Sequence, residues 1–402
     1  MSERIIAIGP EHPLQEEPEC FKLHVEGEKV LSLDIQLGYN HRGVEKLAES
    51  KSYDQILFLM ERICGICSTS HPFAGVNALE NLVGVEVPER AKYIRSILGE
   101  MERIHSHLLW LGLAGHFMGY NTLFMWAWKT REIVLDLLER ISGNRQNYSM
   151  FKVGGVRRDV KDDEIPSYLK ELDRLLPALD LFRGAVADDP VVHARTKGIG
   201  VLTAEDIRRF GAVGPTARAS GVDIDVRLDD PYAAYSMVDW KVVTGTRGDV
   251  YDKVMVRILE MYESHAIITQ CLRKLPPGEI DARVKEIPAG EGIGRHEAPR
   301  GEVMHYVRSD GTNRPARYKV RAPSFMNVAT NTKAVVGQTI SDATLILAAV
   351  DPCYCCSERV SAVERRTGKR LWSGAELVRL SQDATRRLRA KMGFPHEISK
   401  DP

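Results

Sequence analysis

Two Cys-x-x-Cys pairs stand near opposite ends of this chain and constrain its fold more than any other feature. The first pair is Cys64 and Cys67, in "RICGICSTSHP", and the second is Cys353 and Cys356, in "DPCYCCSERV". Zinc ribbons keep their two halves within a few tens of residues of each other. If both pairs bind one metal, the chain must therefore close a large fold around a buried centre.

The spacing alone leaves the metal open. Soft thiolate ligands select zinc, iron–sulfur clusters or other thiophilic transition metals, and four thiolates also form structural zinc sites. Structural zinc and a redox metal are therefore equally compatible with the pattern, and nothing in the spacing names nickel. A thioredoxin-like disulfide is disfavoured, because neither pair follows a strand in a βαβ pattern. Of the seven cysteines, Cys355 is an extra thiol beside the second pair, and Cys20 and Cys271 are expected to be buried apolar residues.

Composition excludes several classes of protein. The formal net charge is +0 over 402 residues, which argues against non-specific nucleic-acid binding, since nothing would neutralise phosphates. No run of about 18 uncharged apolar residues is present, so we expect no membrane span. The start, "MSERIIAIGPEHP", lacks the apolar core of a signal peptide, which predicts a cytoplasmic location.

Hydrophobic periodicity predicts an α+β fold that is predominantly helical: a long-helix bundle with a small lobe made from both ends of the chain. We expect a hairpin over 20–38 and helices over 53–62, over 88–142 with a break near Gly119–Asn121, and over 166–182, 248–275 and 339–350. Alternating runs around "SDGTN" predict strands within 301–323. The expected organisation is an N-terminal β-rich segment (1–50), a helical bundle core (51–290), an α+β segment that closes the metal site (291–359) and a basic C-terminal extension (360–402).

The cysteine motifs resemble the two signature motifs of the [NiFe]-hydrogenase large subunit. Other stretches resemble the 49 kDa catalytic-core subunit of respiratory complex I, namely "GPEHPLQEEP", "YNHRGVEKLAE", "GGVRRDV", "GPTARASGVDIDVRLDDPYAAY", "GDVYDKVMVRILEM" and "CLRKLPPGEI". Complex I-like framework motifs together with hydrogenase-like cysteines are typical of the energy-converting, membrane-associated [NiFe]-hydrogenases. The resemblance covers nearly the whole chain up to Arg359.

This resemblance implies a nickel–iron centre. All four thiolates would bind nickel, with Cys64 and Cys353 as terminal ligands. Cys67 and Cys356 would bridge nickel to an iron that carries carbon monoxide and two cyanide ligands. Such a centre would interconvert protons and dihydrogen, with electrons from a low-potential donor such as a ferredoxin.

The resemblance also implies roles for residues around the centre. Arg300, in "HEAPRGEVMH", would hang over the metals as a fixed cation and base, and Ser324, in "RAPSFMN", would donate to a cyanide. Glu17 would lie next to Cys353 and relay protons with a raised pKa. His71 would donate to a bridging sulfur, and Arg62 would lie in the same surroundings.

Partners and processing follow from the same resemblance. We expect a small subunit with a [4Fe–4S] cluster, a ferredoxin-like subunit, antiporter-like membrane subunits that pump ions, nickel-insertion proteins and a maturation endopeptidase cutting after Arg359. The chain would bind no iron–sulfur cluster itself. A magnesium ion near His41 and Glu45 is in doubt, because Arg359 replaces the family's histidine. The alternatives are a complex I-like quinone-reducing or sulfur-reducing subunit without a working nickel–iron centre, and a structural subunit with a zinc site.

Overall fold

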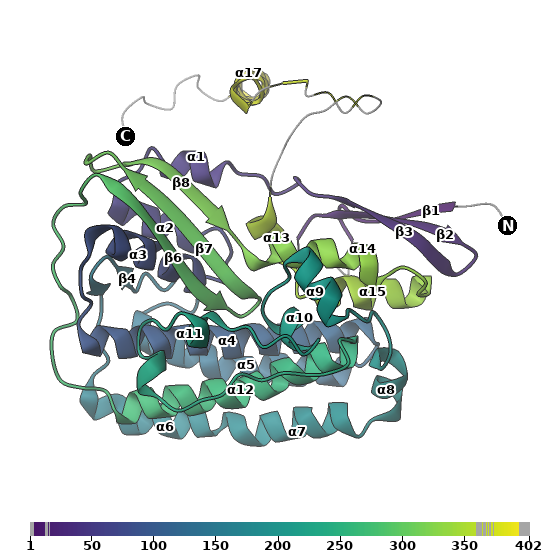
Figure 1. Ribbon diagram of the computed structural model, residues 1–402, viewed down its shortest axis with the longest axis horizontal. Coiled ribbons are helices and arrows are strands. Elements are labelled where there is room, and N and C mark those ends of the chain that lie inside the picture. Colours follow the sequence, from purple (N-terminus) through teal and green to yellow (C-terminus); the bar gives the residue numbers. More distant parts are fainter. Residues whose placement is uncertain are drawn as a thin grey trace. The chain divides into compact units, whose positions relative to one another are not determined.

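The chain divides into two compact units, Met1–Glu358 and Arg359–Pro402. The computed structural model describes residues 4–12, 15, 17–358, 364, 367, 369, 371–372 and 374–393. The first unit combines a helical bundle with small antiparallel sheets, as the sequence predicts (Figure 1). In the described part of the second unit, α17 (Gly374–Lys391) is a helix.

Long helices run side by side in a bundle (Figure 1). Helix α4 contacts α3, α5, α12 and α15, and residues on all its sides are buried, as expected for a central helix. The expected break lies between α4 and α5, at Gly119, whose φ is +80°. The helix expected over 166–182 is two helices, because Pro177 has no N–H to bond the carbonyl of Asp173. The bundle helices are α4 (Glu89–Phe117), α5 (Asn121–Ser142), α6 (Ile165–Asp173), α7 (Leu175–Ala187) and α12 (Val250–Arg273).

One three-stranded sheet packs on helix α3 (Ser70–Val83). Its first strand was not predicted, because glycines interrupt its pattern and are normally depleted in strands. A Cβ on Gly292 would lie 2.1 Å from the Ala78 carbonyl oxygen, and one on Gly294 would lie 2.2 Å from the Ala78 nitrogen. These glycines therefore let the strand lie directly on the helix backbone. The strands are β6 (Gly290–Ala298), β7 (Gly301–Ser309) and β8 (Pro315–Arg321), each antiparallel to the next.

A second three-stranded sheet joins the two ends of the first unit. It contains the predicted hairpin, and its last strand pairs through Val30 with the backbone of Gly337 and Gln338. The described strands form two three-stranded sheets and one two-stranded sheet beside the helical bundle. This pairing brings the segment before Cys20 close to the second cysteine pair. The strands are β1 (Arg4–Ile8), β2 (Cys20–Glu26) and β3 (Lys29–Gln36), in antiparallel order.

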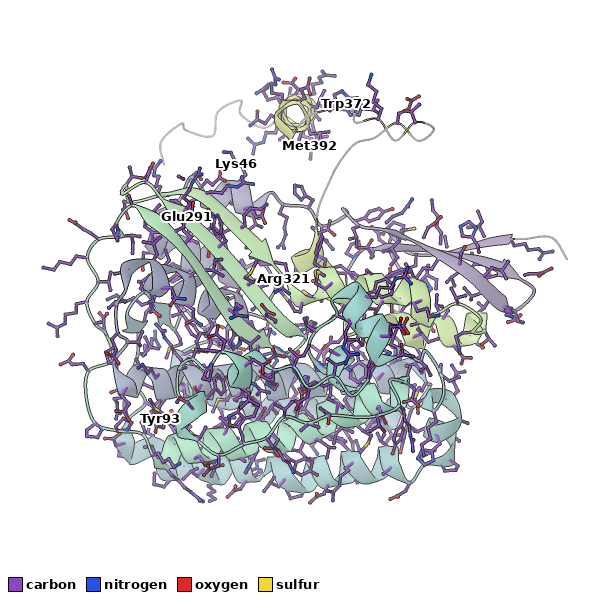
Figure 2. All side chains as sticks on the ribbon, in the orientation of Figure 1. Lys46, Tyr93, Glu291, Arg321, Trp372 and Met392 are labelled. Carbon is purple, nitrogen blue, oxygen red and sulfur yellow. The ribbon has the colours of Figure 1, made fainter. Side chains whose placement is uncertain are left out.

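Short elements fill the space around the bundle and the sheets, and side chains pack between all of them (Figure 2). Among the described residues, no helix is both long enough and apolar enough to cross a bilayer. The remaining elements are α1 (Val44–Ala48), α2 (Tyr53–Glu61), β4 (Phe151–Lys152), β5 (Gly155–Val156), α8 (Pro190–Thr196), α9 (Ala204–Phe210), α10 (Pro215–Arg218), α11 (Val226–Asp229), α13 (Pro323–Asn327), α14 (Asn331–Ala334), α15 (Ile340–Ala349), α16 (Tyr354–Ser357) and the 3-10 helices Asp162–Glu164, Tyr235–Met237 and Val328–Thr330.

Candidate metal centre

The two cysteine pairs meet in the core of the first unit. The sulfurs of Cys64, Cys353, Cys355 and Cys356 all lie within 4.8 Å of one another. The Cys67 thiol contacts those of Cys64, Cys353 and Cys356. Both pairs are buried. We refer to these five thiols as the cysteine cluster.

The first pair follows the end of α2, where Arg42 holds the chain. The Arg42 guanidinium donates to the carbonyls of Arg62 at 3.0 Å, Ile63 at 2.7 Å and Cys355 at 3.2 Å. One side chain therefore ties the loops of both pairs together. Sequence reasoning missed this role, although Arg42 lies in the motif "YNHRGVEKLAE", because nothing local pairs Arg42 with position 355.

Beyond the first pair, Glu102 of α4 binds the start of α3. Its carboxyl accepts from the backbone N–H groups of Thr69 and Ser70 and from the Ser70 hydroxyl. A carboxyl at a helix N-terminus satisfies donors that the helix itself leaves unpaired. Burial raises the pKa of Glu102 to about 8. Glu102 thus sets the direction in which the chain leaves Cys67.

The second pair follows α15 through a strained residue. Asp351 has a φ of +54°, which is uncommon for a residue other than glycine. Arg300 compensates this conformation, since its Nε donates to the Asp351 carbonyl at 2.9 Å and its Nη2 lies 2.8 Å from the carboxylate. Arg300 therefore positions the segment that leads into Cys353.

The same guanidinium reaches the cysteine cluster, as the resemblance implies. Its Nη1 lies 3.4 Å from the Cys67 sulfur and 3.2 Å from the Ser106 hydroxyl, and the side chain is 1% exposed. The negative charges of Asp351 and the cysteines hold the pKa of Arg300 well above its usual value, despite its burial. A permanent positive charge thus lies against the sulfurs.

A chain of hydrogen bonds leads away from Cys356. The His71 Nε2 lies 3.3 Å from the Cys356 sulfur, and the His71 Nδ1 lies 3.1 Å from the His305 Nε2. The His305 Nδ1 lies 2.9 Å from the Tyr318 hydroxyl. Burial lowers the pKa of His71 to about 4 and that of His305 well below its usual value, so both rings are neutral at pH 7. His305 and Tyr318 were not predicted, because they come from β7 and β8, far from either pair in the sequence.

Glu17 and Ser324, two further residues expected around the centre, both accept hydrogen bonds from the backbone of the loop that carries the second pair. Glu17 accepts from the Cys355 N–H at 2.7 Å, two residues after the expected Cys353. Burial, and then the negative charge of Cys64, raise the pKa of Glu17. The Ser324 hydroxyl accepts from the Cys353 N–H at 2.9 Å, which leaves its own proton free to bond elsewhere.

Arg62 does not point into the cysteine cluster. Its guanidinium donates to the Phe58 carbonyl at 2.8 Å and pairs with Glu61 at 3.0 Å, and its side chain is 52% exposed. The expectation for Arg62 was therefore wrong in position, because the helix end directs it along α2. Glu45, the doubtful magnesium ligand, accepts from the Val320 N–H at 3.0 Å. Arg359 and the expected cleavage point lie outside the described residues.

The electrostatics of the cysteine cluster suit a soft cation. Hydrogen bonds from neighbouring thiols, first that of Cys353, hold the pKa of Cys64 well below its usual value. Burial raises the pKa of Cys356 well above its usual value. A metal ion would replace the protons shared among these sulfurs and satisfy them all. The donor set therefore fits a thiophilic metal with Arg300 and Ser324 as outer partners.

A small, mainly apolar cavity of about 40 Å³ lies beside the segment that precedes Cys353. Trp110, Leu347, Pro352 and Tyr354 are among its lining residues, together with Asp351. It lies between α4, α15 and the N-terminal segment.

Comparison with known families identifies two matching regions. Residues 42–113, which contain the first pair, match the nickel-dependent hydrogenase family. Residues 118–287 and 282–359, which contain the second pair, match the family described as the 49 Kd subunit of respiratory-chain NADH dehydrogenase. Together the two matches cover both halves of the candidate centre.

Comparison with individual proteins gives the same grouping. The chain is 42% identical to the membrane-bound hydrogenase subunit alpha of Pyrococcus furiosus, over 95% of this chain and 93% of that one. It is also 42% identical to the carbon monoxide-induced hydrogenase of Rhodospirillum rubrum, over 89% and 100% of the two chains. A solved structure of a membrane-bound sulfane sulfur reductase, an archaeal respiratory membrane complex, superimposes with a TM-score of 0.84 at 30% identity, over 89% of this chain and 98% of that chain.

Proposed function

Because this chain belongs to the family that unites the complex I 49 kDa subunit with the large subunits of membrane-bound hydrogenases, we propose that it is the catalytic subunit of an energy-converting [NiFe]-hydrogenase. The reaction would be the reversible reduction of two protons by two electrons to dihydrogen. The observation that carries this proposal is the meeting of Cys64 and Cys67 with Cys353 and Cys356 at one buried point.

These four thiolates would hold nickel, and Cys67 and Cys356 would also hold an iron with carbon monoxide and two cyanide ligands. When bound, this centre supplies the heterolytic cleavage and formation of dihydrogen. Arg300 supports it, because a buried guanidinium 3.4 Å from Cys67 stabilises negative charge on the sulfur without titrating. Ser324 has a hydroxyl proton available for an anionic ligand.

Glu17 is suited to moving protons between the cluster and the surface. Its raised pKa means that its carboxyl holds a proton more readily than an ordinary glutamate does, which suits a proton relay. It is half-buried, and its Oε2 accepts a hydrogen bond from the Cys355 N–H. The His71 Nε2 contacts the Cys356 sulfur, and the lowered pKa of His71 keeps this ring neutral.

The setting would be a multi-subunit membrane complex, as for the relatives whose names describe membrane-bound enzymes. We propose that the chain is a peripheral subunit at the cytoplasmic face. A small subunit with a [4Fe–4S] cluster would deliver electrons from a ferredoxin-like donor, and antiporter-like membrane subunits would couple the reaction to ion pumping. Nickel-insertion proteins and an endopeptidase would assemble the centre.

A second candidate is a sulfur-reducing or quinone-reducing subunit without nickel. The superposition on the sulfane sulfur reductase and the match to the NADH dehydrogenase subunit favour it. Both candidates are oxidoreductases, and metal content separates them.

The test is to measure nickel and iron in the purified complex and to record its infrared spectrum between the protein and water bands. We expect about one nickel per chain with carbon monoxide and cyanide stretches, both lost in Cys67→Ser. Cys20→Ala, which removes a buried thiol outside the cluster, is the matched control. Zinc alone, or no metal and no such bands, would replace the hydrogenase proposal by the second candidate.

A further inference from the structure

The cysteine cluster contains one thiol more than the proposed nickel–iron centre uses. Cys355 lies in the short helix α16, between the two cysteines of the second pair, and its sulfur is 3.5 Å from that of Cys353. It belongs to the set of four sulfurs that lie within 4.8 Å of one another, together with Cys64, Cys353 and Cys356. A tetrahedral thiolate site with metal–sulfur bonds of about 2.3 Å holds its sulfurs about 3.8 Å apart. The Cys353 and Cys355 sulfurs are close to this separation, whereas those of Cys353 and Cys356, 2.7 Å apart, would move apart on binding.

The backbone of Cys355 is held on both sides. Its N–H donates to Glu17 and its carbonyl accepts from Arg42. These bonds come from two separate segments of the chain, so the direction of the Cys355 side chain is set before any metal binds. A ligand that needs no reordering loses less conformational entropy on binding.

Cys355 is also the accessible member of the cluster. It is half-buried, whereas the other four thiols are buried. The Cys67 sulfur, in contrast, lies on the inner side against the Arg300 guanidinium. A cation that arrives from solvent therefore meets Cys355 first.

Charge around the cluster permits a fully thiolate site. A divalent cation with four thiolates carries a net charge of −2, and such a charge is costly to bury without compensation. The Arg300 side chain touches the cluster, and the Arg42 guanidinium lies 3.2 Å from the Cys355 carbonyl. Two permanent positive charges thus lie close to the cluster.

We propose that, before any nickel–iron centre is assembled, the chain binds a thiophilic divalent cation on Cys64, Cys353, Cys355 and Cys356. Cys355 takes the place that Cys67 has in the proposed centre. The cation binds four thiolates, so each ligand that is still protonated releases its proton to solvent, and no electron is transferred. Cys355 is the access ligand, and a cation held in this way keeps the thiols reduced and competes with nickel.

The experiment uses the full-length chain, freed of metal under anaerobic, reducing conditions and titrated with Co²⁺. Thiolate-bound cobalt gives intense charge-transfer and visible bands whose strength reports the number of thiolates and the tetrahedral geometry. We expect Cys355→Ser to weaken Co²⁺ binding by ~10-fold or more, since loss of an outer partner alone costs that much. Cys67→Ser should change the affinity by less than about threefold and leave the bands intact.

Cys20→Ala is the matched control, and circular dichroism checks that each variant is folded. If Cys355→Ser does not fold, alkylation of the unmodified chain with iodoacetamide decides the question. Bound Co²⁺ should protect Cys355 from alkylation. Equal effects of the two cluster variants, a larger effect of Cys67→Ser, no Co²⁺ binding by the unmodified chain, or an unprotected Cys355 would each overturn the inference.

The two proposals fail separately, because this inference concerns the chain without its nickel–iron centre. The proposed function requires Cys67 and not Cys355 for nickel and for the infrared bands. The cobalt site requires Cys355 and not Cys67. A chain that binds Co²⁺ as expected but never shows nickel would keep the inference and lose the hydrogenase proposal.

Discussion

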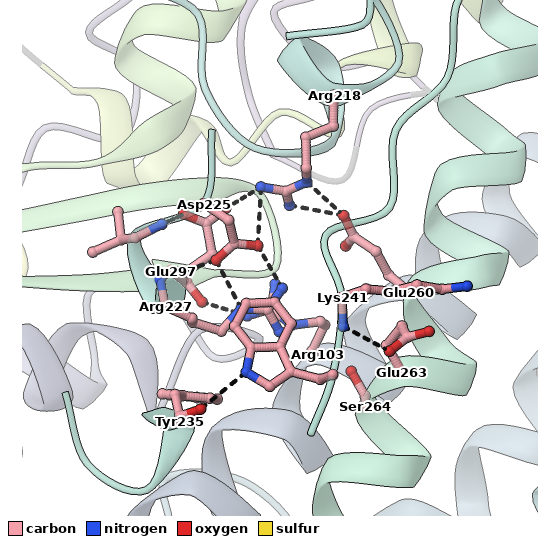
Figure 3. Close-up of polar contacts among 12 residues, drawn as sticks. Arg103, Arg218, Asp225, Arg227, Tyr235, Lys241, Glu260, Glu263, Ser264 and Glu297 are labelled. Carbon is pink, nitrogen blue, oxygen red and sulfur yellow. Dashed lines mark hydrogen bonds and ion pairs between the residues drawn. The ribbon is translucent and has the colours of Figure 1, made fainter. Parts of the chain in front are cut away.

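The cysteine cluster and an ionic network around Arg218 are both buried in the first unit, but they satisfy their polar groups in opposite ways. Figure 3 shows part of the network, in which Arg218 and Arg227 face the carboxylates of Asp225, Glu260 and Glu297. Arg218 lies 2.8 Å from both Glu260 and Glu297. In the cysteine cluster the sulfurs face mainly one another, and Arg300 and His71 are among their few polar neighbours.

The network is closed by further pairs among helices and loops. Arg227 lies 2.6 Å from Asp225 and 3.0 Å from Glu100, and Arg103 lies 3.1 Å from Glu100. Burial raises the pKa of Glu297 to about 7. Its protonated form would balance the network, which is formed by Arg103, Arg218, Arg227, Glu100, Asp225, Glu260 and Glu297.

The difference teaches which buried polar region is structural and which is a binding site. In a closed network every charged group already has a partner, so the network binds nothing further. Soft sulfurs that mainly contact one another can instead be satisfied by a metal cation. The two regions adjoin through Arg257, which lies 3.9 Å from Asp351 on one side and feels the charge of Glu260 on the other. The network therefore holds the frame in which Asp351 and Arg300 position the cysteines.

The largest expected effect comes from opening the closed network. Arg218→Leu leaves Glu260 and Glu297 without their counter-ion, which should lower the free energy of unfolding by about 3–5 kcal/mol. Chemical denaturation of the purified chain measures this. The control Arg174→Leu breaks an exposed pair with Glu171 and should cost less than about 1 kcal/mol. A loss as small as that of the control would show that the network does not stabilise the fold.

The second prediction tests proton movement at the cysteine cluster. Glu17→Gln keeps an acceptor for the Cys355 N–H but cannot carry a proton, so hydrogen–deuterium exchange catalysed by the complex should slow by about 10²-fold. Nickel content should stay unchanged. Glu11→Gln, at an exposed position, should leave the rate as it is. An unaltered rate in Glu17→Gln would remove Glu17 from the proton path.

The third prediction concerns Lys253, one turn before Arg257 in α12. Burial, and then the charge of Arg257, lower the pKa of Lys253 to about 7, and its Nζ donates to the Gly200 carbonyl at 3.0 Å. Between pH 7 and the usual lysine pKa the unfolded chain binds more protons than the folded one. Stability should therefore rise with pH in this window, by at most about 1.4 kcal/mol per pH unit from this group.

Lys253→Met should remove this rise, as measured by denaturation at several pH values. The exposed Lys274→Met should retain it. If both variants keep the pH dependence of stability of the unmodified chain, Lys253 is charged in the folded state. Water then reaches the region between the network and the cysteine cluster, although Lys253 is buried.

The smallest expected effect is at the far end of the hydrogen-bond chain. Tyr318→Phe removes the hydroxyl partner of His305, so the orientation of His71 toward Cys356 should loosen. We expect at most about a tenfold loss of activity, with shifted cyanide stretches in the infrared spectrum. Tyr306→Phe, on the opposite face of β7, should shift nothing. Unshifted bands in both variants would limit His305 and Tyr318 to packing.

Much of the fold was predictable because its signals are local. The break between α4 and α5, the hairpin at 20–38 and the strands around "SDGTN" follow from periodicity and turn residues within a few positions. Strand β6 escaped prediction, because the reason for Gly292 and Gly294 is the backbone of α3, about two hundred residues earlier in the sequence. The split at Pro177 was a local signal that the helical pattern of 166–182 concealed.

The cysteine pairs themselves were determined by the sequence. A Cys-x-x-Cys spacing presents two soft ligands close together whatever surrounds it. The sequence alone therefore predicts thiol ligands and a resemblance to a metal centre. The proximity of Arg300, Ser324 and Glu17 to the cluster also agrees with the motifs that carry them.

Only the tertiary structure decided what faces those sulfurs. Arg42 bonds the Cys355 carbonyl, and His71 bonds His305, so each contact joins segments more than two hundred residues apart. Tyr318, on the strand next to that of His305, continues the hydrogen-bond chain. Arg62, two positions before Cys64, points away from the cysteine cluster along α2. Local spacing encodes which atoms a segment offers, but the packing of distant elements determines which of them meet.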